Sequence, residues 1–194
     1  MPTLLETLTQ HLGGDALSQP SRQLGTDERT TSTAITAALP AIVGALARNT
    51  SSPAGATALE SALVKDHDGS VLDNPTAALA NPQLDVGSGI LRHVFGERQG
   101  VVAAGVGEVA GLDSAKSSKL LAMLAPLVLA ALARKRQTDG LDAGGLAGML
   151  GQERARLDTQ GGGAFGALMQ LIDRNHDGSV VDDVGGMLGG MFKR

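Results

Sequence analysis

Oxygen-bearing side chains alternate with other residues in one short segment near the C-terminus of this 194-residue chain. Asp173, Asn175 and Asp177 take the first, third and fifth places, and Gly178 takes the sixth. EF-hand loops use this spacing to surround a hard cation such as Ca²⁺, because alternate side chains supply oxygen ligands and glycine permits the sharp turn. The loop 173–183 is therefore predicted to be an EF-hand-like calcium site between two helices.

The end of this loop departs from the EF-hand pattern. The twelfth place normally holds a glutamate that supplies a bidentate carboxylate, but it is Val184 here. Two aspartates just before Val184 are the candidates for closing a modified loop. The candidate metal ligands all carry side-chain oxygen atoms and are Asp173, Asn175, Asp177, Ser179, Asp182 and Asp183.

An earlier segment repeats part of this pattern. The letters DHDGSVLDN at 66–74 resemble NHDGSVVDD at 175–183. The earlier segment is the weaker metal candidate, because Val64 stands at the first place of its loop. Its oxygen-bearing side chains are those of Asp66, Asp68, Asp73 and Asn74.

A structural alternative explains both segments without a metal. Asp-Gly favours a turn, and a serine followed three residues later by an acidic residue is typical of a helix capping box. This alternative predicts that Ser70 pairs with Asp73 and that Ser179 pairs with Asp182. It leaves the oxygens of Asp173 and Asn175 unexplained, so both interpretations stay open.

Catalytic constellations are not expected. His67 and His176 each precede an aspartate, but neighbouring residues do not face one another, so neither pair forms a catalytic dyad. No serine lies in the strand-turn-helix context of a nucleophile elbow. The glycine spacing in 161–166 matches a dinucleotide fingerprint by letters only, since no strand precedes it. We expect a non-enzymatic protein.

Two long apolar stretches must position these loops. They are AITAALPAIVGALA at 34–47 and LLAMLAPLVLAALA at 120–133, and each carries one proline, Pro40 or Pro126. Each is too long for an ordinary strand and shorter than the about 20 residues of a membrane span, so two buried and similarly bent core helices are predicted. The alternative is that these helices leave the bundle under some conditions and associate with a membrane.

Matched residues indicate an internal duplication. At an offset of eighty-six residues Gly25 corresponds to Gly111, Asp27 to Asp113 and Pro40 to Pro126. Apolar periodicity with glycine, proline and capping residues at the boundaries predicts helices. Their expected ranges are 2–12, 15–24, 27–48, 53–65, 75–80, 85–95, 99–110, 114–137 and 141–157.

The predicted fold class is all-α, a multihelical bundle built from two related halves with a C-terminal EF-hand-like helix-loop-helix. The bundle is assigned to 1–160, with halves of about 1–75 and 85–137 and an extra helix at 141–157. The helix-loop-helix is assigned to 161–194 and is joined through glycines 161–163.

Composition excludes several classes of function. Sixteen basic and twenty acidic residues give a net charge of −4, and there is no Trp or Tyr to stack on bases, so we expect no nucleic-acid partner. The absence of cysteine excludes disulfides and thiolate chemistry. The first residues lack the basic and long apolar regions of a signal peptide, so the default localisation is cytoplasmic.

Small residues mark one face of the final predicted helix. Gly185 with Gly189 and Gly186 with Gly190 would let another helix approach closely. That helix could belong to the same bundle, to a second copy of the chain or to a protein partner. All three alternatives stay open.

Four segments together resemble the YidB-like family of bacterial proteins, a domain family of unknown function. They are LLETLTQHLGGDALSQ, ALPAIVGALARN, DHDGSVLDN and LIDRNHDGSVVDDVGGMLGG, and they span nearly the whole chain. The resemblance implies an all-helical fold and assigns no activity. Some members of the family are fused to envelope-associated peptidoglycan-binding domains, which keeps envelope association open.

We therefore expect a bacterial interaction or structural protein that works through protein contacts or self-association. Ca²⁺ is the one cofactor that the residues suggest, through the loop 173–183. A weak calcium loop fills only where calcium is abundant, so occupancy would favour an envelope or extracellular setting over the cytosol.

Overall fold

The computed structural model describes residues 3–159, and every regular element in that range is a helix. The α-helices are α1 (Leu4–His11), α2 (Asp15–Leu24), α3 (Glu28–Asn49), α4 (Pro53–Lys65), α5 (Pro75–Ala80), α6 (Leu84–Phe95), α7 (Gln99–Ala110), α8 (Ser114–Asp139) and α9 (Ala143–Thr159). Two short 3-10 helices are η1 (Ser70–Asp73) and η2 (Gly96–Arg98). The all-helical prediction is confirmed for this range, and each predicted helix in it ends within two residues of its expected bounds.

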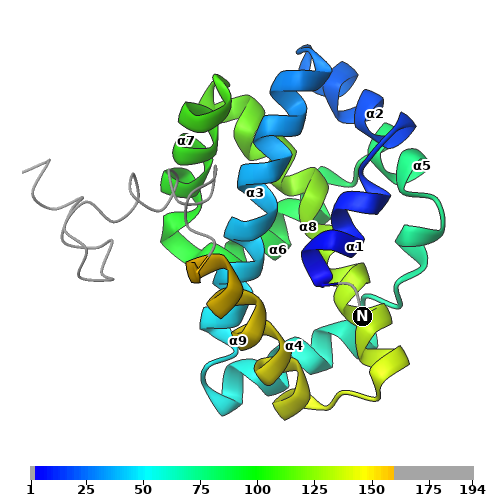
Figure 1. The fold of residues 1–194 in the computed structure, drawn as a ribbon, viewed down its shortest axis with the longest axis vertical. Coiled ribbons are helices and arrows are strands. Elements are labelled where there is room, and N and C mark those ends of the chain that lie inside the picture. The colour runs from blue at the N-terminus through cyan, green and yellow to red at the C-terminus, as the bar shows by residue number, and fades with distance from the viewer. Residues whose placement is uncertain (1–2, 160–194) are drawn as a thin grey trace, which may run out of the picture.

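The two apolar stretches form the centre of the bundle, as predicted. Helices α3 and α8 contact each other and are surrounded by the remaining helices (Figure 1). Each begins at an aspartate, because the carboxylates of Asp27 and Asp113 accept hydrogen bonds from the backbone N–H groups of Thr30 (2.9 Å) and Lys116 (2.8 Å). These caps fix where the two central helices start.

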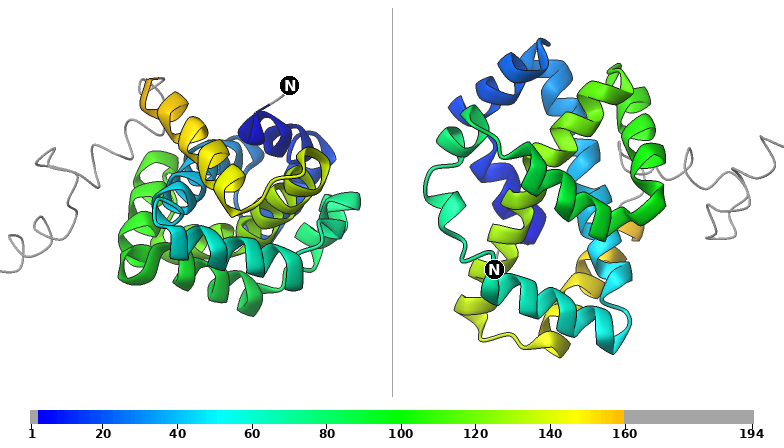
Figure 2. Two further views of the ribbon diagram at one scale, coloured as in Figure 1. Left: turned by 90° about the horizontal axis from the view of Figure 1, so that it is seen from below. Right: turned by 180° about the vertical axis from the view of Figure 1, so that it is seen from behind.

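The outer helices pack crosswise on the central pair. Helix α1 packs on α8, and α6 and α7 pack on both α3 and α8. Helix α9 lies against α3 and α4, while α2 lies between α3 and α5. The two further views in Figure 2 show α4 and α9 together at one end of the bundle.

Helix α6 approaches α8 unusually closely at Gly87. A Cβ atom at this position would lie 1.9 Å from the carbonyl oxygen of Ala122. Glycine therefore lets the backbones of α6 and α8 meet, and buried Leu91 and Val94 follow on the same helix. No such contact surrounds Gly89, whose added Cβ would meet nothing within 4 Å.

The central helices also meet the length and hydropathy of membrane spans. Among the described residues, Glu28–Asn49 and Ser114–Asp139 pass this criterion by length and composition. In each helix 72% of the apolar window is buried inside the bundle. Core helices of a soluble protein satisfy the same criterion when they are surrounded by other helices.

The predicted helix-loop-helix at 161–194 lies outside the described residues. The described chain ends with α9, which packs against the bundle through Leu146, Leu150 and Leu157.

Candidate functional site

The predicted calcium ligands lie outside the described residues, and calcium binding there stays a prediction. They are Asp173, Asn175, Asp177, Ser179, Asp182 and Asp183.

The related segment 66–74 is described, and it forms a hydrogen-bonded turn. The Oδ1 atom of Asp68 accepts hydrogen bonds from the backbone N–H of Ser70 (2.9 Å) and from its hydroxyl (2.6 Å). These bonds stabilise the carboxylate and lower the pKa of Asp68 below its ordinary value. Gly69 adopts a φ of 89°, which glycine tolerates better than other residues.

The predicted capping box between Ser70 and Asp73 is wrong. The carboxylate of Asp68 accepts the hydrogen bond from the backbone N–H of Ser70, and the carboxylate of Asp73 pairs with the guanidinium of Arg134 on α8. The local pattern favoured a contact three residues away, but a basic side chain on another helix competes for the same carboxylate. Asp73 therefore joins η1 to α8.

Further contacts hold this turn against α8. The side-chain amide of Gln137 donates to the carbonyl oxygen of Asp68 at 3.2 Å, and a Cβ atom at Gly69 would lie 2.7 Å from Cγ of Arg134. Partial burial lowers the pKa of His67, although Asp66 and Asp68 oppose that effect. Within residues 3–159 no three His, Asp or Glu side chains are grouped as a metal site. The segment 66–74 thus acts as a structural clamp.

The basic run that follows the apolar part of α8 is paired with acidic side chains. Arg134 pairs with Asp73, Lys135 with Asp139 at 2.7 Å, and Arg136 with Glu60 at 3.2 Å. Each pair ties α8 to a different place, namely η1, its own next turn and α4. The run is therefore not a free positive patch for an anionic surface.

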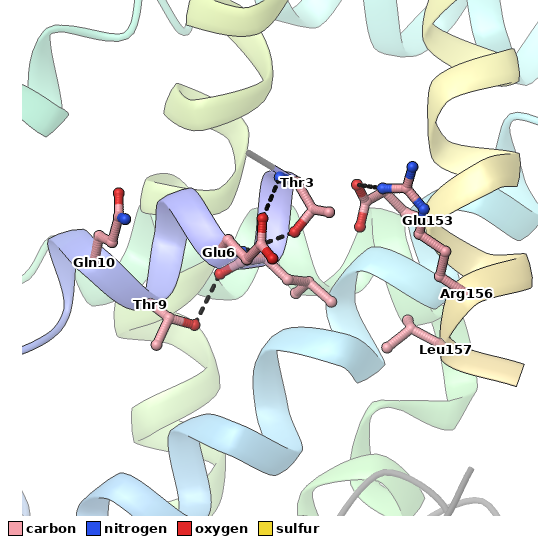
Figure 3. Close-up of a pocket in the computed structure, with 8 residues that line it drawn as sticks. Thr3, Glu6, Thr9, Gln10, Glu153, Arg156 and Leu157 are labelled. Atoms are coloured by element: carbon pink, nitrogen blue, oxygen red, sulfur yellow. Dashed lines mark hydrogen bonds and ion pairs between the residues drawn. The ribbon is translucent and has the colours of Figure 1, made fainter. Parts of the chain in front are cut away.

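A shallow groove runs along one side of α9, and we call it the α9 groove. One end is a depression of about 430 Å³ between α9, the start of α1 and the end of α8. The other end is a depression of about 390 Å³ between α1 and α9 (Figure 3). The α9 residues that line the groove are Gly145, Gly148, Met149, Gln152, Glu153, Arg156 and Leu157.

These seven residues form a single helical stripe, with spacings of three and four. The neighbouring stripe, which contains Leu146 and Leu150, packs into the core. A Cβ atom at Gly148 would meet nothing within 4 Å, so this part of the groove is open. The pattern of α9 thus aims one side at the core and leaves Gly148, Gln152 and Arg156 exposed on the adjacent side.

Glu153 is the buried charged residue of the groove, with 5% of its surface exposed. Its Oε1 atom accepts a hydrogen bond from the backbone N–H of Leu4 at 3.2 Å and lies 3.6 Å from Nη1 of Arg156. Thr3 and Glu6 form a capping box at the start of α1 (Figure 3). Glu153 therefore fixes the first turn of α1 against α9 and keeps the groove in shape.

The lining of the groove is chemically mixed. Its apolar side chains are those of Leu5, Leu141, Met149 and Leu157. Lys135 pairs with Asp139 and Arg156 with Glu153, while Glu6 accepts a hydrogen bond from the backbone N–H of Thr3. Among the described residues that line it there is no histidine or serine to act as base or nucleophile. The groove thus combines a few apolar side chains with polar and charged ones.

A second surface feature joins three arginines from distant parts of the chain. Partial burial lowers the pKa of Arg48, and the positive charges of Arg98 and Arg154 act in the same direction. The side-chain amide of Asn49 donates to the carbonyl oxygen of Val94 at 3.0 Å, which brings the end of α3 to the end of α6. This cluster lies on α3, η2 and α9.

Sequence reasoning missed both surface features. A helix over 141–157 was predicted, and Leu146, Leu150 and Leu157 carry its helical spacing, but no local signal shows which of its residues stay exposed. The partners of Glu153 could not be read locally, because Leu4 lies at the other end of the described chain.

Comparison with protein families gives one match. A family model described as a bacterial protein of unknown function (DUF937) matches residues 6–135. No curated protein and no solved structure matches the chain. The match spans α1 to α8 almost completely and does not include α9, so the family says nothing about most of the α9 groove.

Proposed function

Because the chain belongs to the DUF937 family of bacterial proteins of unknown function, with a match over residues 6–135, we propose that it is a non-enzymatic helical protein that works through protein contacts. In this proposal the α9 groove receives the apolar side of an amphipathic helix from a protein partner. The observation that carries the proposal is the row of exposed residues Gly148, Gln152 and Arg156 on α9, beside the half-buried side chain of Met149.

The dimensions of the groove suit a short helix. The stripe from Gly145 to Leu157 extends over about 18 Å, which corresponds to roughly three helical turns. Gly148 adds no side chain between the two helix backbones, and an added Cβ there would meet nothing within 4 Å, so a partner helix can lie close at this position. The ion pairs at the edge satisfy their own charges, and an apolar partner would leave none of them unpaired.

Two matched substitutions on α9 test this proposal. Gln152 lines the groove, whereas Ala155, which is also exposed on α9, does not. Gln152→Trp should block the groove, and Ala155→Trp should leave it open. Affinity capture from a bacterial extract, quantified by mass spectrometry, should show partners retained by wild type and by A155W and lost with Q152W. Equal retention by both variants would exclude the groove as the contact surface.

We also propose that the bundle has two related halves of about 1–75 and 85–137, which contain α1 to α4 and α6 to α8, with α9 as an extra helix. Two observations support this: the helices occur in matching order, and the first helix of each series packs on the long central helix of the other series. If the halves are equivalent, a circular permutant opened between Ala80 and Leu84 should keep the far-UV circular dichroism and one cooperative transition. A permutant without helical structure would count against this origin.

Calcium modulation through the loop 173–183 is part of the proposal, supported by the spacing of its oxygen-bearing residues. Calorimetric titration of the chain with Ca²⁺ should give heat that disappears in the Asp173→Ala and Asp177→Ala double variant. Asp66→Ala, in the segment 66–74, is the matched control and should keep the heat. If wild type gives no heat, the loop is not a calcium site and the HDGS letters mark a turn.

For localisation we propose the cytoplasm unless calcium titration reveals millimolar affinity. A millimolar site fills only in an envelope or extracellular setting. Fractionation of the native cells separates the two settings.

Membrane association is the second candidate, favoured by the length and hydropathy of α3 and α8. Burial of 72% of each window and the pairing of all three basic residues at 134–136 count against it. Flotation with phosphatidylglycerol and phosphatidylethanolamine vesicles at neutral and acidic pH tests it. Absence from the lipid fraction at both pH values would remove this candidate.

A further inference from the structure

The described chain ends at Thr159, the last residue of α9, directly beside the end of the α9 groove that Arg156 and Leu157 line. We infer that the segment 164–172 of the same chain folds back along α9 and occupies the groove. This inference rests on the proposed function, since it names the first occupant of the same surface.

The length of the connection fits this arrangement. Residues 160–163 are Gln followed by three glycines, and two antiparallel helices are commonly joined by two to five residues. A helix over 164–172 would be about 14 Å long. Running antiparallel to α9, it would extend from the level of Leu157 to about the level of Gly148 and would pass Gln152 near its middle.

The side chains of this segment match the groove. Phe165, Leu168, Met169 and Ile172 are spaced as one apolar side of a helix, and the range 164–172 contains no charged residue. Met149 and Leu157 give the groove an apolar part, and four of its charged groups form ion pairs. The fifth, Glu6, accepts a hydrogen bond from the backbone N–H of Thr3 at 2.7 Å, so docking would leave no charged group of the groove without a polar partner.

Occupation by the tail would regulate access to the groove. A segment tethered through four residues has an effective concentration in the millimolar range, so a partner must displace it. The predicted calcium loop begins at Asp173, immediately after the docked segment. The residues that would bind calcium therefore follow directly on the residues that would bind the groove.

Engineered disulfides test the inference in the full chain, which contains no natural cysteine. Gln152→Cys is combined in turn with Phe165→Cys, Leu168→Cys, Met169→Cys and Ile172→Cys. A matched series places the same four substitutions with Ala155→Cys, which lies outside the groove. Circular dichroism of each reduced variant confirms that the bundle is intact.

A docked tail should give an intramolecular disulfide in at least one Gln152→Cys combination, about tenfold or more faster than in the corresponding Ala155→Cys combination. Equal rates in the two series would show a tail that only samples space around its tether, and would overturn the inference. Disulfides between chains would assign the groove to a second copy and would also overturn it.

The result separates this inference from the proposed function. No preferred disulfide, together with partner capture that Q152W abolishes, would leave the groove as a site for other proteins alone. A preferred disulfide without any Q152W-sensitive capture would leave the groove as a site for the tail alone.

Discussion

The packing of α6 on α8 predicts opposite effects for two glycines that are two residues apart. A Cβ atom at Gly87 would lie 1.9 Å from the carbonyl oxygen of Ala122 and 2.7 Å from its carbonyl carbon, and real Cβ atoms essentially never approach closer than 3.0 Å. Relief therefore requires the two helix backbones to separate by roughly 1 Å, because neither backbone atom can rotate away. Gly87→Ala should consequently loosen the contact between α6 and α8.

The magnitude follows from two opposing terms. Overpacking of a tight core typically costs about 1–3 kcal/mol, and a clash with backbone belongs at the upper end. Replacing glycine by alanine inside a helix returns about 0.5–1 kcal/mol. We expect Gly87→Ala to lower the free energy of unfolding by about 2 kcal/mol, which corresponds to a Tm about 4–8 °C lower for a domain of this size.

Gly89→Ala is the control on the same helix, since its added Cβ would meet nothing within 4 Å. It should raise the free energy of unfolding by about 0.5–1 kcal/mol and the Tm by about 1–4 °C. Thermal and urea unfolding followed by far-UV circular dichroism measure both variants in a chain without Trp or Tyr. Equal stability of the two variants would refute the close backbone contact between α6 and α8.

Three further predictions concern charged groups. Glu153→Ala leaves the buried N–H of Leu4 without its acceptor, so it should lower the free energy of unfolding, measured in urea, by about 2 kcal/mol. A decrease of less than about 0.5 kcal/mol would contradict the hydrogen-bonded contact between α1 and α9. Burial lowers the pKa of His67. Its contribution to the free energy of unfolding should therefore be fully present above pH 6.5 and should decrease as the pH drops below that value. His67→Gln should make the free energy of unfolding less dependent on pH in this range. Hydrogen bonds from Thr30 lower the pKa of Asp27. Asp27→Ala should therefore be less stable than wild type above pH 3.8, and this difference in the free energy of unfolding should vanish as the pH falls below that value. A difference that persists in acid argues against this linkage.

The helices were predictable because residues close to each boundary determine where the helix begins and ends. Asp27 and Asp113 cap the central helices through their own side chains, and Gly25 and Gly111 end the preceding helices with positive φ values. The apolar spacing then decides which side of each helix faces inward. These signals act within a few residues, so they can be read without knowing the rest of the fold.

The candidate site was not predictable, because its geometry depends on contacts between distant segments. Glu153 has the neighbours of an ordinary surface residue in sequence, yet the N–H of Leu4 draws it into a position with 5% exposure. Asp73 is a second example, because its carboxylate pairs with Arg134, whereas the local capping pattern predicted a pairing with Ser70. A local rule gives a preference, and tertiary packing selects among the available partners.

The same contacts determine what membrane association would require. Helix α8 is held by ion pairs to η1 and α4, and its apolar side chains, with those of α3, form the centre of the core. Removing either helix would expose the apolar sides of the helices packed around it, so insertion would have to accompany unfolding of the bundle. Flotation should then begin only at the pH or temperature where circular dichroism reports loss of the fold. A lipid-bound fraction of intact bundle would instead require a surface contact, and the α9 groove would be the first place to look for it.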